Sequence, residues 1–229
     1  MKAVVIGATR GLGLALTKML LAEGHTVAAG IRAREIPEIL RVLEAQYGGK
    51  LLVGSADVTS EDDVRSFAAA AAAFMGKADA LCVVAGINLD GDRTHPLQEC
   101  VFSDIRETFA VNTLGPILAV RYFYPLMEKG GKALIITSEG VGLRSAWGGM
   151  PGYSLSKTAA TKAAGILNAS APDVDFYAVH PGRVISDMNP NGEIDADESA
   201  AGLIGIMAGT VPVSREVWYI DYKGGPMDM

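Results

Sequence analysis

Cysteine and histidine are scarce in this chain, with 2 cysteines and 3 histidines among 229 residues. Two cysteines make no disulfide framework, and Cys82 stands in the apolar run ALCVVA, which is typical of a buried, unreactive thiol. The three histidines (His25, His95 and His180) have no metal-ligand spacing. We therefore expect neither a disulfide-stabilised fold nor a metal site.

Long apolar runs and clusters of basic residues are also missing. The longest uncharged stretch of interest, residues 199–214, has 16 residues with three glycines and a proline, so it falls short of the ~18–20 residues of a membrane-spanning helix. Residues 1–7 lack the length and the flanks of a signal peptide. The 20 basic and 26 acidic side chains give a net charge of −6, which argues against nucleic-acid binding. These absences predict a cytoplasmic protein that binds neither membranes nor nucleic acids.

The chain is rich in residues that build a core, since 49% are hydrophobic and 20% are charged. Short β-branched runs alternate with longer segments rich in Ala and Leu. This order predicts one doubly wound α/β domain, residues 1–229, with a parallel sheet of about seven strands and helices on both faces. The predicted strands are Lys2–Gly7, Thr26–Ile31, Leu51–Gly54, Ala80–Ala85, Lys132–Thr137, Asp175–Val179 and Val217–Ile220. The predicted helices are Leu12–Ala22, Glu35–Tyr47, Ser60–Met75, Phe102–Met127 (one helix or two), Gly152–Asn168 and Asp197–Ala208.

A glycine-rich loop, Gly7-Ala-Thr-Arg-Gly11-Leu-Gly13, joins the first predicted strand to the first predicted helix. Glycine has no Cβ, so the backbone there approaches a pyrophosphate closely, and the helix N-terminus faces the negative charge. The three-glycine string is weak by itself, but its place between a strand and a helix is typical of a dinucleotide-binding Rossmann fold. We expect Gly7, Thr9, Gly11, Leu12 and Gly13 to hold a dinucleotide.

The end of the second predicted strand carries arginines and no carboxylate. Its sequence is Gly30-Ile-Arg32-Ala-Arg34, and the next acidic residue is Glu35. A dinucleotide fold contacts the adenosine ribose at this point, where an acidic residue binds a free 2′-hydroxyl and an arginine accommodates a 2′-phosphate. Arg10, in the glycine loop, can approach the same corner. Arg32 and Arg10 therefore favour NADP(H) over NAD(H).

A tyrosine and a lysine stand one helical turn apart in Tyr153-Ser-Leu-Ser-Lys157, so they face the same side of a helix. A cation beside a phenol lowers its pKa, so we expect Tyr153 to exchange a proton with a substrate oxygen near neutral pH. Ser138 ends the fifth predicted strand, and Pro181-Gly182 follows the sixth. Because ligands bind at the carboxyl ends of strands in open α/β sheets, these residues are expected at one site.

Together these motifs resemble the short-chain dehydrogenase/reductase family over essentially the whole chain, the shorter carbonyl-reductase-like and cell-signalling members in particular. The residues that match the family's catalytic tetrad are Asn112, Ser138, Tyr153 and Lys157. Those that match its cofactor-binding motifs, beside the glycine loop, are the adenine pair Asp57-Val58, the fourth-strand motif Ala85-Gly86, and Pro181, Gly182, Val184 and Ser186 of the nicotinamide segment. In three places the chain departs from the family: Ile6 replaces a Thr, Val83-Val84 replace paired asparagines, and Ser186 replaces a Thr but keeps the hydroxyl.

The resemblance implies an oxidoreductase that moves a hydride between NADP(H) and a carbonyl/alcohol pair. Tyr153 would be the general acid in reduction and the base in oxidation. Lys157 would lower the pKa of Tyr153 and hold the nicotinamide ribose, while Ser138 would bind the substrate oxygen. Asn112 would support a water-linked proton relay to Lys157, and Asn112, Tyr153 and Lys157 would all contact the cofactor. The resemblance also implies helices that pair across a two-fold axis, hence a homodimer or homotetramer.

Two other functions stay open. An NADP(H)-binding regulatory or signalling protein with incidental turnover is disfavoured by the intact tetrad, because binding alone does not need Tyr153. A nucleotide-sugar epimerase or dehydratase is disfavoured because only 48 residues follow Pro181, too few for a second substrate lobe.

Residues 140–152 and 186–197 are expected to line the substrate side. Their largely apolar side chains favour a partly apolar, uncharged substrate, or else mark loop packing or a subunit contact. They include Val141, Leu143, Arg144, Trp147, Met150 and Met188.

Overall fold

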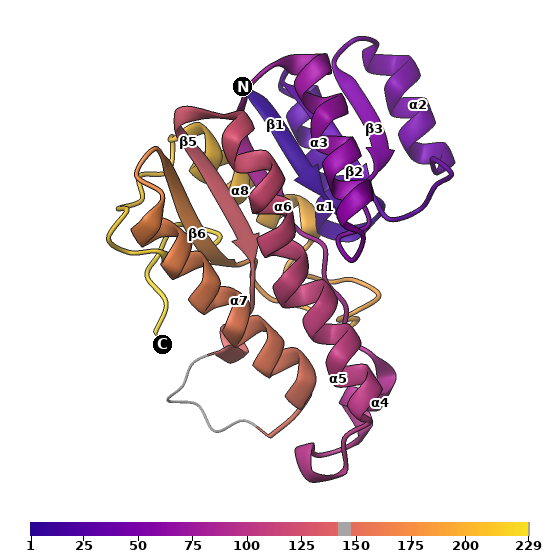
Figure 1. The fold of residues 1–229 in the computed structure, drawn as a ribbon, viewed down its shortest axis with the longest axis vertical. Helices are drawn as coiled ribbons and strands as arrows, with labels where there is room; N and C mark the ends of the chain where they lie inside the picture. Colours follow the sequence, from indigo (N-terminus) through magenta and orange to yellow (C-terminus); the bar gives the residue numbers. More distant parts are fainter. Residues whose placement is uncertain (142–147, 229) are drawn as a thin grey trace.

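Seven parallel strands form the centre of the structure, a computed structural model that describes residues 1–141 and 148–228 (Figure 1). They are hydrogen-bonded in the order β3-β2-β1-β4-β5-β6-β7. The strands are β1 (Lys2–Ile6), β2 (Thr26–Ile31), β3 (Leu51–Ser55), β4 (Ala78–Val83), β5 (Met127–Ile136), β6 (Val174–His180) and β7 (Tyr219–Asp221). This arrangement confirms the predicted doubly wound fold.

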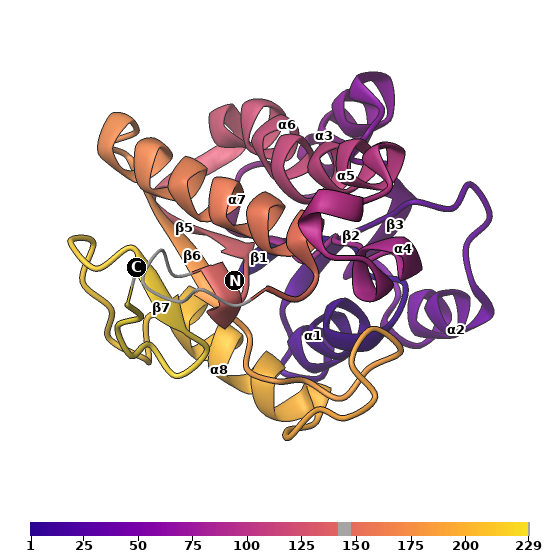
Figure 2. The ribbon, with the colours of Figure 1, turned by 90° about the horizontal axis from the view of Figure 1, so that it is seen from below.

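Helices cover both faces of the sheet (Figure 2). The helices are α1 (Gly11–Ala22), α2 (Glu38–Tyr47), α3 (Glu61–Met75), α4 (Asp90–Thr94), α5 (Phe102–Phe109), α6 (Gly115–Phe123), α7 (Pro151–Ser170) and α8 (Ala196–Ala208). One core cluster joins the sheet to α1, α2 and α8, and a second joins its other face to α3, α6 and α7. The central strands are apolar on both faces for this reason. No helix in the described part of the chain is long and apolar enough to cross a membrane.

The strand order reverses between β1 and β4, which lie side by side. The loops that follow these two strands turn to opposite sides, so a crevice forms at their carboxyl ends. Backbone hydrogen bonds link neighbouring strands at this end of the sheet. The N–H groups of Gly7 and Ala8 donate to the carbonyl of Gly30, and that of Ala85 donates to the carbonyl of Ile6.

Proline sets two element boundaries that differ from the prediction. The segment predicted as helical from Phe102 to Met127 is α5, a π-helical turn (Ala110–Leu114) and α6, and the helix ends at Phe123. Pro125 lies in the following 3₁₀ turn and cannot continue a helix, so Met127 belongs to β5 instead. The helix predicted from Glu35 starts at Glu38, because Pro37 before it has an extended backbone with ψ 147°.

The short helix α4 was not predicted at all. Its five residues, DGDRT, carry no apolar side chain, so they offer no helical periodicity to read. It nevertheless contacts both α5 and α7 and, as shown below, contributes to the candidate site.

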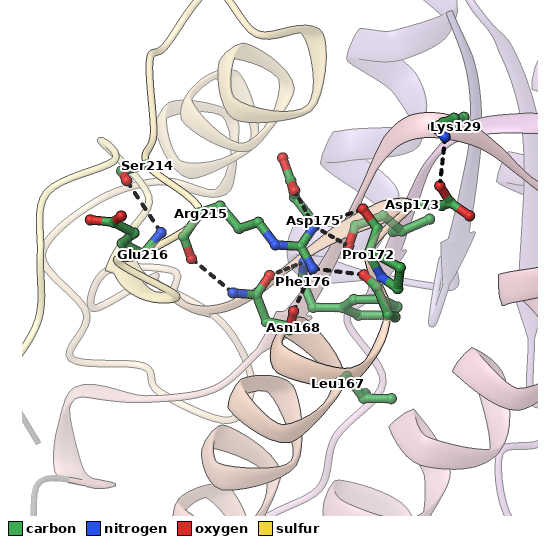
Figure 3. A network of polar contacts seen from close by, with 12 residues as sticks. Lys129, Leu167, Asn168, Pro172, Asp173, Asp175, Phe176, Ser214, Arg215 and Glu216 are labelled. Atoms are coloured by element: carbon green, nitrogen blue, oxygen red, sulfur yellow. Dashed lines mark hydrogen bonds and ion pairs between the residues drawn. The ribbon is translucent and has the colours of Figure 1, made fainter.

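Arg215 fixes the C-terminal end of α7 (Figure 3). Its guanidinium donates to the carbonyls of Asn168 and Ala171 and to the carboxylate of Asp175, the last at 2.8 Å. Asn168 in turn donates to the carbonyl of Arg215 and accepts from the N–H of Phe176. A cation at a helix C-terminus complements the helix dipole. The loop before β7 therefore anchors α7, the helix that carries Tyr153 and Lys157.

Candidate active site

A cavity of about 1280 Å³ opens at the carboxyl ends of β1, β4, β5 and β6. Most of the predicted site residues line it: Gly7, Thr9, Arg10, Gly11, Leu12, Arg32, Val58, Ala85, Gly86, Ser138, Tyr153, Lys157, Pro181, Gly182, Val184 and Ser186. Three of the predicted residues, Gly13, Asp57 and Asn112, are not in its wall. Three residues of the predicted tetrad, Ser138, Tyr153 and Lys157, therefore line the same cavity as the glycine loop, although the loop is far from them in sequence.

The glycine loop is held against the end of β4. Gly7 has a φ of 98°, and a Cβ there would lie 2.7 Å from the backbone nitrogen of Ala85. A Cβ on Gly13 would lie 2.1 Å from the carbonyl oxygen of Gly7, so Gly13 serves the packing of the loop on α1 and stays outside the cavity wall. The first turn of α1 has no acidic residue, and Arg10 at its N-cap forms no side-chain cap. The backbone N–H groups at the N-terminus of α1 therefore have no side-chain cap and can bind an anion.

Asp57 and Val58 support the site from behind. The Asp57 carboxylate accepts from the backbone N–H and the hydroxyl of Thr59, at 2.9 and 2.7 Å, and so closes a local turn. Val58 is buried and packs on Gly115, where a Cβ would come within 2.7 Å of it. Val58 reaches the cavity wall, whereas Asp57 does not.

The two arginines expected near the adenosine ribose behave differently. Arg32 lines the cavity and is exposed. Arg10 also lines it, but its guanidinium donates to the carboxylate of Asp187 at 2.7 Å. This ion pair was not predicted, and it joins the glycine loop to the segment after β6 across the mouth of the cavity.

Asn112 and Lys157 are packed together behind Gly86. The amide of Asn112 accepts from the N–H of Ile87 and donates to the carbonyl of Ile87 and to the hydroxyl of Ser156, at 2.8, 2.9 and 3.1 Å. Its side chain thus ties the end of β4 to α7. Lys157 is 3% exposed and donates to the carbonyl of Ile136 at 2.7 Å. Burial lowers the pKa of Lys157 to about 8.

The phenol of Tyr153 sits beside Ser138 and Lys157. The Lys157 ammonium lies 5.9 Å from the centroid of the Tyr153 ring. Burial raises the pKa of Tyr153, while a hydrogen bond to Ser138 and the charge of Arg93 lower it by less. The net shift is upward, so our expectation that Lys157 brings this pKa down does not hold for the protein alone: the desolvation of the phenol outweighs its charged neighbours.

The N-terminus of α7 is capped by a carboxylate from α4. Asp92 is 4% exposed and accepts from the backbone N–H groups of Gly152 and Tyr153, at 2.6 and 2.7 Å. Met150, just before the helix, has a left-handed backbone with a φ of 48°. Sequence reasoning missed Asp92 because nothing in its neighbourhood marks a contact 60 residues away. The only signal was an acidic residue, a type favoured near helix N-termini.

The segment that follows β6, which includes Pro181, Gly182 and Ser186, lines another part of the cavity wall. Gly182 has a φ of 82°, and a Cβ there would lie 2.4 Å from Ile194. The hydroxyl of Ser199 donates to the carbonyl of Pro181 at 2.6 Å, which ties the segment to α8. Ser186 forms a tight turn with Asn189, with N···O distances of 3.0 and 3.1 Å between their backbones.

The expected substrate side is only partly as predicted. Met150 and Met188 line the cavity, whereas Val141 is buried in the core and does not. Leu143, Arg144 and Trp147 lie outside the described residues. Arg93 of α4 lines the same region and was not predicted.

Comparison with known proteins gives consistent relatives. The family model described as short chain dehydrogenase matches residues 1–197. The 1-hydroxy-2-glutathionyl-2-methyl-3-butene dehydrogenase of Rhodococcus sp. strain AD45 is 30% identical over 211 residues, 88% of this chain and 88% of the relative. The hydroxynaphthalene reductase of Aspergillus fumigatus is 26% identical over 193 residues, 81% of this chain and 67% of the relative.

Solved structures agree on the fold. A protein from Burkholderia multivorans, assigned to the short-chain dehydrogenase/reductases and solved with bound NADP, superposes with a TM-score of 0.84 at 25% identity, covering 100% of this chain and 99% of the other. A carbonyl reductase from Pseudomonas aeruginosa PAO1 gives 0.82 at 24% identity, with the same coverage.

Proposed function

Because the chain belongs to the short-chain dehydrogenase family, we propose that this oxidoreductase transfers a hydride between NADP(H) and a carbonyl/alcohol pair at the cavity described above. The observation that carries the proposal is that Tyr153, Ser138 and Lys157 line the same hollow as the glycine loop. The glycine loop and the uncapped N-terminus of α1 fit the pyrophosphate of a dinucleotide. When bound, the nicotinamide supplies or accepts the hydride.

In this proposal Tyr153 moves the proton. The phenol is protonated at neutral pH, so it can donate to the carbonyl oxygen during reduction as a general acid. Ser138 holds that oxygen through its hydroxyl. Lys157 binds the nicotinamide ribose and places a positive charge near the phenolate that forms. The side chain of Asn112 is fully engaged in hydrogen bonds, so its part is to hold the end of β4 and α7 in register.

The test of this function is Tyr153→Phe. The substitution removes one hydroxyl and leaves the α7 backbone contacts in place, so the fold and NADPH binding are retained. The rate of NADPH oxidation with carbonyl substrates falls by at least ~100-fold, the low end for loss of a general acid–base group. Near wild-type turnover by Tyr153→Phe overturns the proposal. Tight NADPH binding without turnover over a broad panel of carbonyls would point to a regulatory protein instead.

Cofactor choice follows from the end of β2. Arg32 lines the cavity there, and Arg10 reaches the 2′-phosphate if it exchanges its partner Asp187. The NADP bound to the Burkholderia multivorans relative supports this choice. NADPH should bind at least ~10-fold more tightly than NADH, which needs only about 1.4 kcal/mol. Arg32→Asp removes or reverses this preference in a fluorescence titration, whereas the matched change Arg34→Asp, outside the cavity wall, does so far less. Equal binding of the two cofactors by the wild type contradicts the assignment.

We also propose a homodimer or homotetramer. Apolar side chains stay exposed on neighbouring helical elements: Leu114 and Ile117 around the start of α6, and Leu155 and Ile166 on α7. Phe123 at the end of α6 is buried instead and packs edge-on against Phe67. A strictly monomeric mass near 23.9 kDa in light scattering at micromolar concentration would contradict the proposal.

A further inference from the structure

The cavity has a charge that the chain as a whole does not share. Among the described residues of its wall, five side chains are basic and two are acidic, although the chain carries a net charge of −6. The basic residues are Arg10, Arg32, Arg93, Lys157 and Arg183, and the acidic ones are Glu139 and Asp187. A wall with an excess of positive charge attracts ligands of negative charge, so the cavity favours anions.

Most of these charges already have a partner or a task. Arg10 pairs with Asp187, and Arg183 pairs with Glu193 at 3.2 Å. Lys157 is buried against the carbonyl of Ile136. Glu139 lies 3.8 Å from the ring of His180. Arg32 stands at the adenosine end in the proposed function.

Among the described residues of the wall, Arg93 is the basic residue that remains, and it lies near Tyr153 and away from Arg32. One of its terminal nitrogens donates to the carbonyl of Met188 at 2.6 Å, which sets the guanidinium between α4 and the segment after β6. It forms no ion pair with any carboxylate in residues 1–141 and 148–228. The adjacent carboxylate of Asp92 is turned into the N-terminus of α7.

The position of Arg93 relative to Tyr153 determines which groups the remaining N–H donors of its guanidinium can reach. Both side chains line the cavity, and Asp92, the residue directly before Arg93, accepts a hydrogen bond from the backbone N–H of Tyr153 at 2.7 Å. A guanidinium has five N–H donors, and one contact is to a backbone carbonyl. Within residues 1–141 and 148–228 the other donors have no partner, so they can bind a group that enters beside Tyr153.

We propose that Arg93 binds a carboxylate of the substrate, so that the enzyme acts on oxo acids, or on the corresponding hydroxy acids, rather than on neutral carbonyl compounds. The inference rests on the proposed function and names its substrate class. The planar fork of arginine matches a carboxylate in two parallel hydrogen bonds. This substrate class differs from the uncharged substrate that residues 140–152 and 186–197 favoured, because those segments do not include α4.

The experiment compares oxo acids of several chain lengths with their methyl esters, which keep the ketone and lose the charge. NADPH oxidation by the wild type is expected to give a kcat/KM at least ~10-fold higher for the acid of a matched pair. Arg93→Gln keeps an N–H donor for the carbonyl of Met188 but removes the charge. It should lower kcat/KM by at least ~10-fold for the acids, through KM, and leave the esters within about 3-fold. Arg93→Lys should restore part of the loss.

Each other outcome has one meaning. An equal loss on acids and esters in Arg93→Gln overturns the inference, because Arg93 would then only support the segment around Met188. A wild-type preference for esters, or activity on neutral carbonyls alone, also overturns it but leaves the proposed function standing. If the wild type reduces neither acids, esters nor simple aldehydes and ketones, the proposed function fails and this inference fails with it.

Discussion

Replacing Asp92 tests how the position of Tyr153 is secured. Asp92→Asn keeps the size of the side chain and one acceptor oxygen. Its NH₂ group, however, would face one of the two backbone N–H groups that the carboxylate now satisfies at 2.6 and 2.7 Å. One of these N–H groups belongs to Tyr153 itself. The substitution therefore loosens the first turn of α7 without changing any group that contacts substrate.

The expected loss follows from the contacts. A hydrogen bond to a charged group contributes ~1.5–3 kcal/mol, and a buried donor left without an acceptor costs a similar amount. Asp92→Asn loses one such bond and the favourable placement of a negative charge at a helix N-terminus, so the free energy of unfolding should fall by about 2 kcal/mol. A displacement of the phenol by ~1 Å is enough to slow a reaction ~100-fold. We expect kcat to fall by ~10- to 100-fold with little change in the KM for NADPH.

The assay pairs urea unfolding with steady-state kinetics, and Arg215→Ala is the matched control. Arg215 holds the other end of the same helix, by hydrogen bonds to Asn168, Ala171 and Asp175, and it is not in the cavity wall. Its loss should lower stability by at least as much as Asp92→Asn while kcat stays within about 3-fold of the wild type. If both variants lose stability and neither loses kcat, Asp92 supports the fold alone and the reasoning is refuted.

Three further outcomes are expected. Because burial lowers the pKa of Lys157 from 10.5 to about 8, the unfolded chain binds more protons than the folded one above pH 8. The stability of the wild type relative to Lys157→Met should therefore rise by about 1 kcal/mol between pH 8 and 9 in urea titrations, and a flat difference contradicts the burial of the charge. Gly13→Ala forces a Cβ to within 2.1 Å of the Gly7 carbonyl, so calorimetry should show NADPH affinity lowered at least ~10-fold; unchanged affinity means that the loop adapts. Arg215→Lys should recover less than half of the stability lost in Arg215→Ala, since an ammonium cannot span the separate carbonyls that the planar guanidinium reaches; full recovery shows that charge alone suffices.

The fold was predictable because its signals are local. Continuous apolar runs such as Val4–Ile6 identified the buried parallel strands, and Ser60 with three acidic residues after it marked the start of α3, where its hydroxyl accepts from the N–H of Asp63. The glycine loop was predictable for the same reason, because its spacing and its place between strand and helix lie within 13 residues. The resemblance to the short-chain dehydrogenase family is confirmed by the family match to residues 1–197.

The parts that escaped prediction depend on contacts distant in sequence. The Arg10–Asp187 pair joins residues 177 positions apart, and no local pattern distinguishes a paired arginine from a free one. The sign of the pKa shift of Tyr153 was wrong because the i, i+4 spacing reveals the nearby lysine and not the burial of the phenol. Helix α4 was missed because it has no apolar face, yet it supplies both Asp92 and Arg93.

Both ends of helix α7 are held by charged side chains from other parts of the chain, Asp92 at the start and Arg215 at the end. It buries Lys157, and a pKa of about 8 in place of 10.5 means that holding the ammonium charged at neutral pH costs about 3 kcal/mol. In the proposed function Lys157 is required for the chemistry, so substitution would remove this cost only together with the activity. Asp92 at one end and Arg215 at the other each supply contacts worth a few kcal/mol, enough to offset it. Since neither partner lies on α7 itself, the stability of the helix that carries Tyr153 and Lys157 depends in part on contacts from α4 and from the loop before β7.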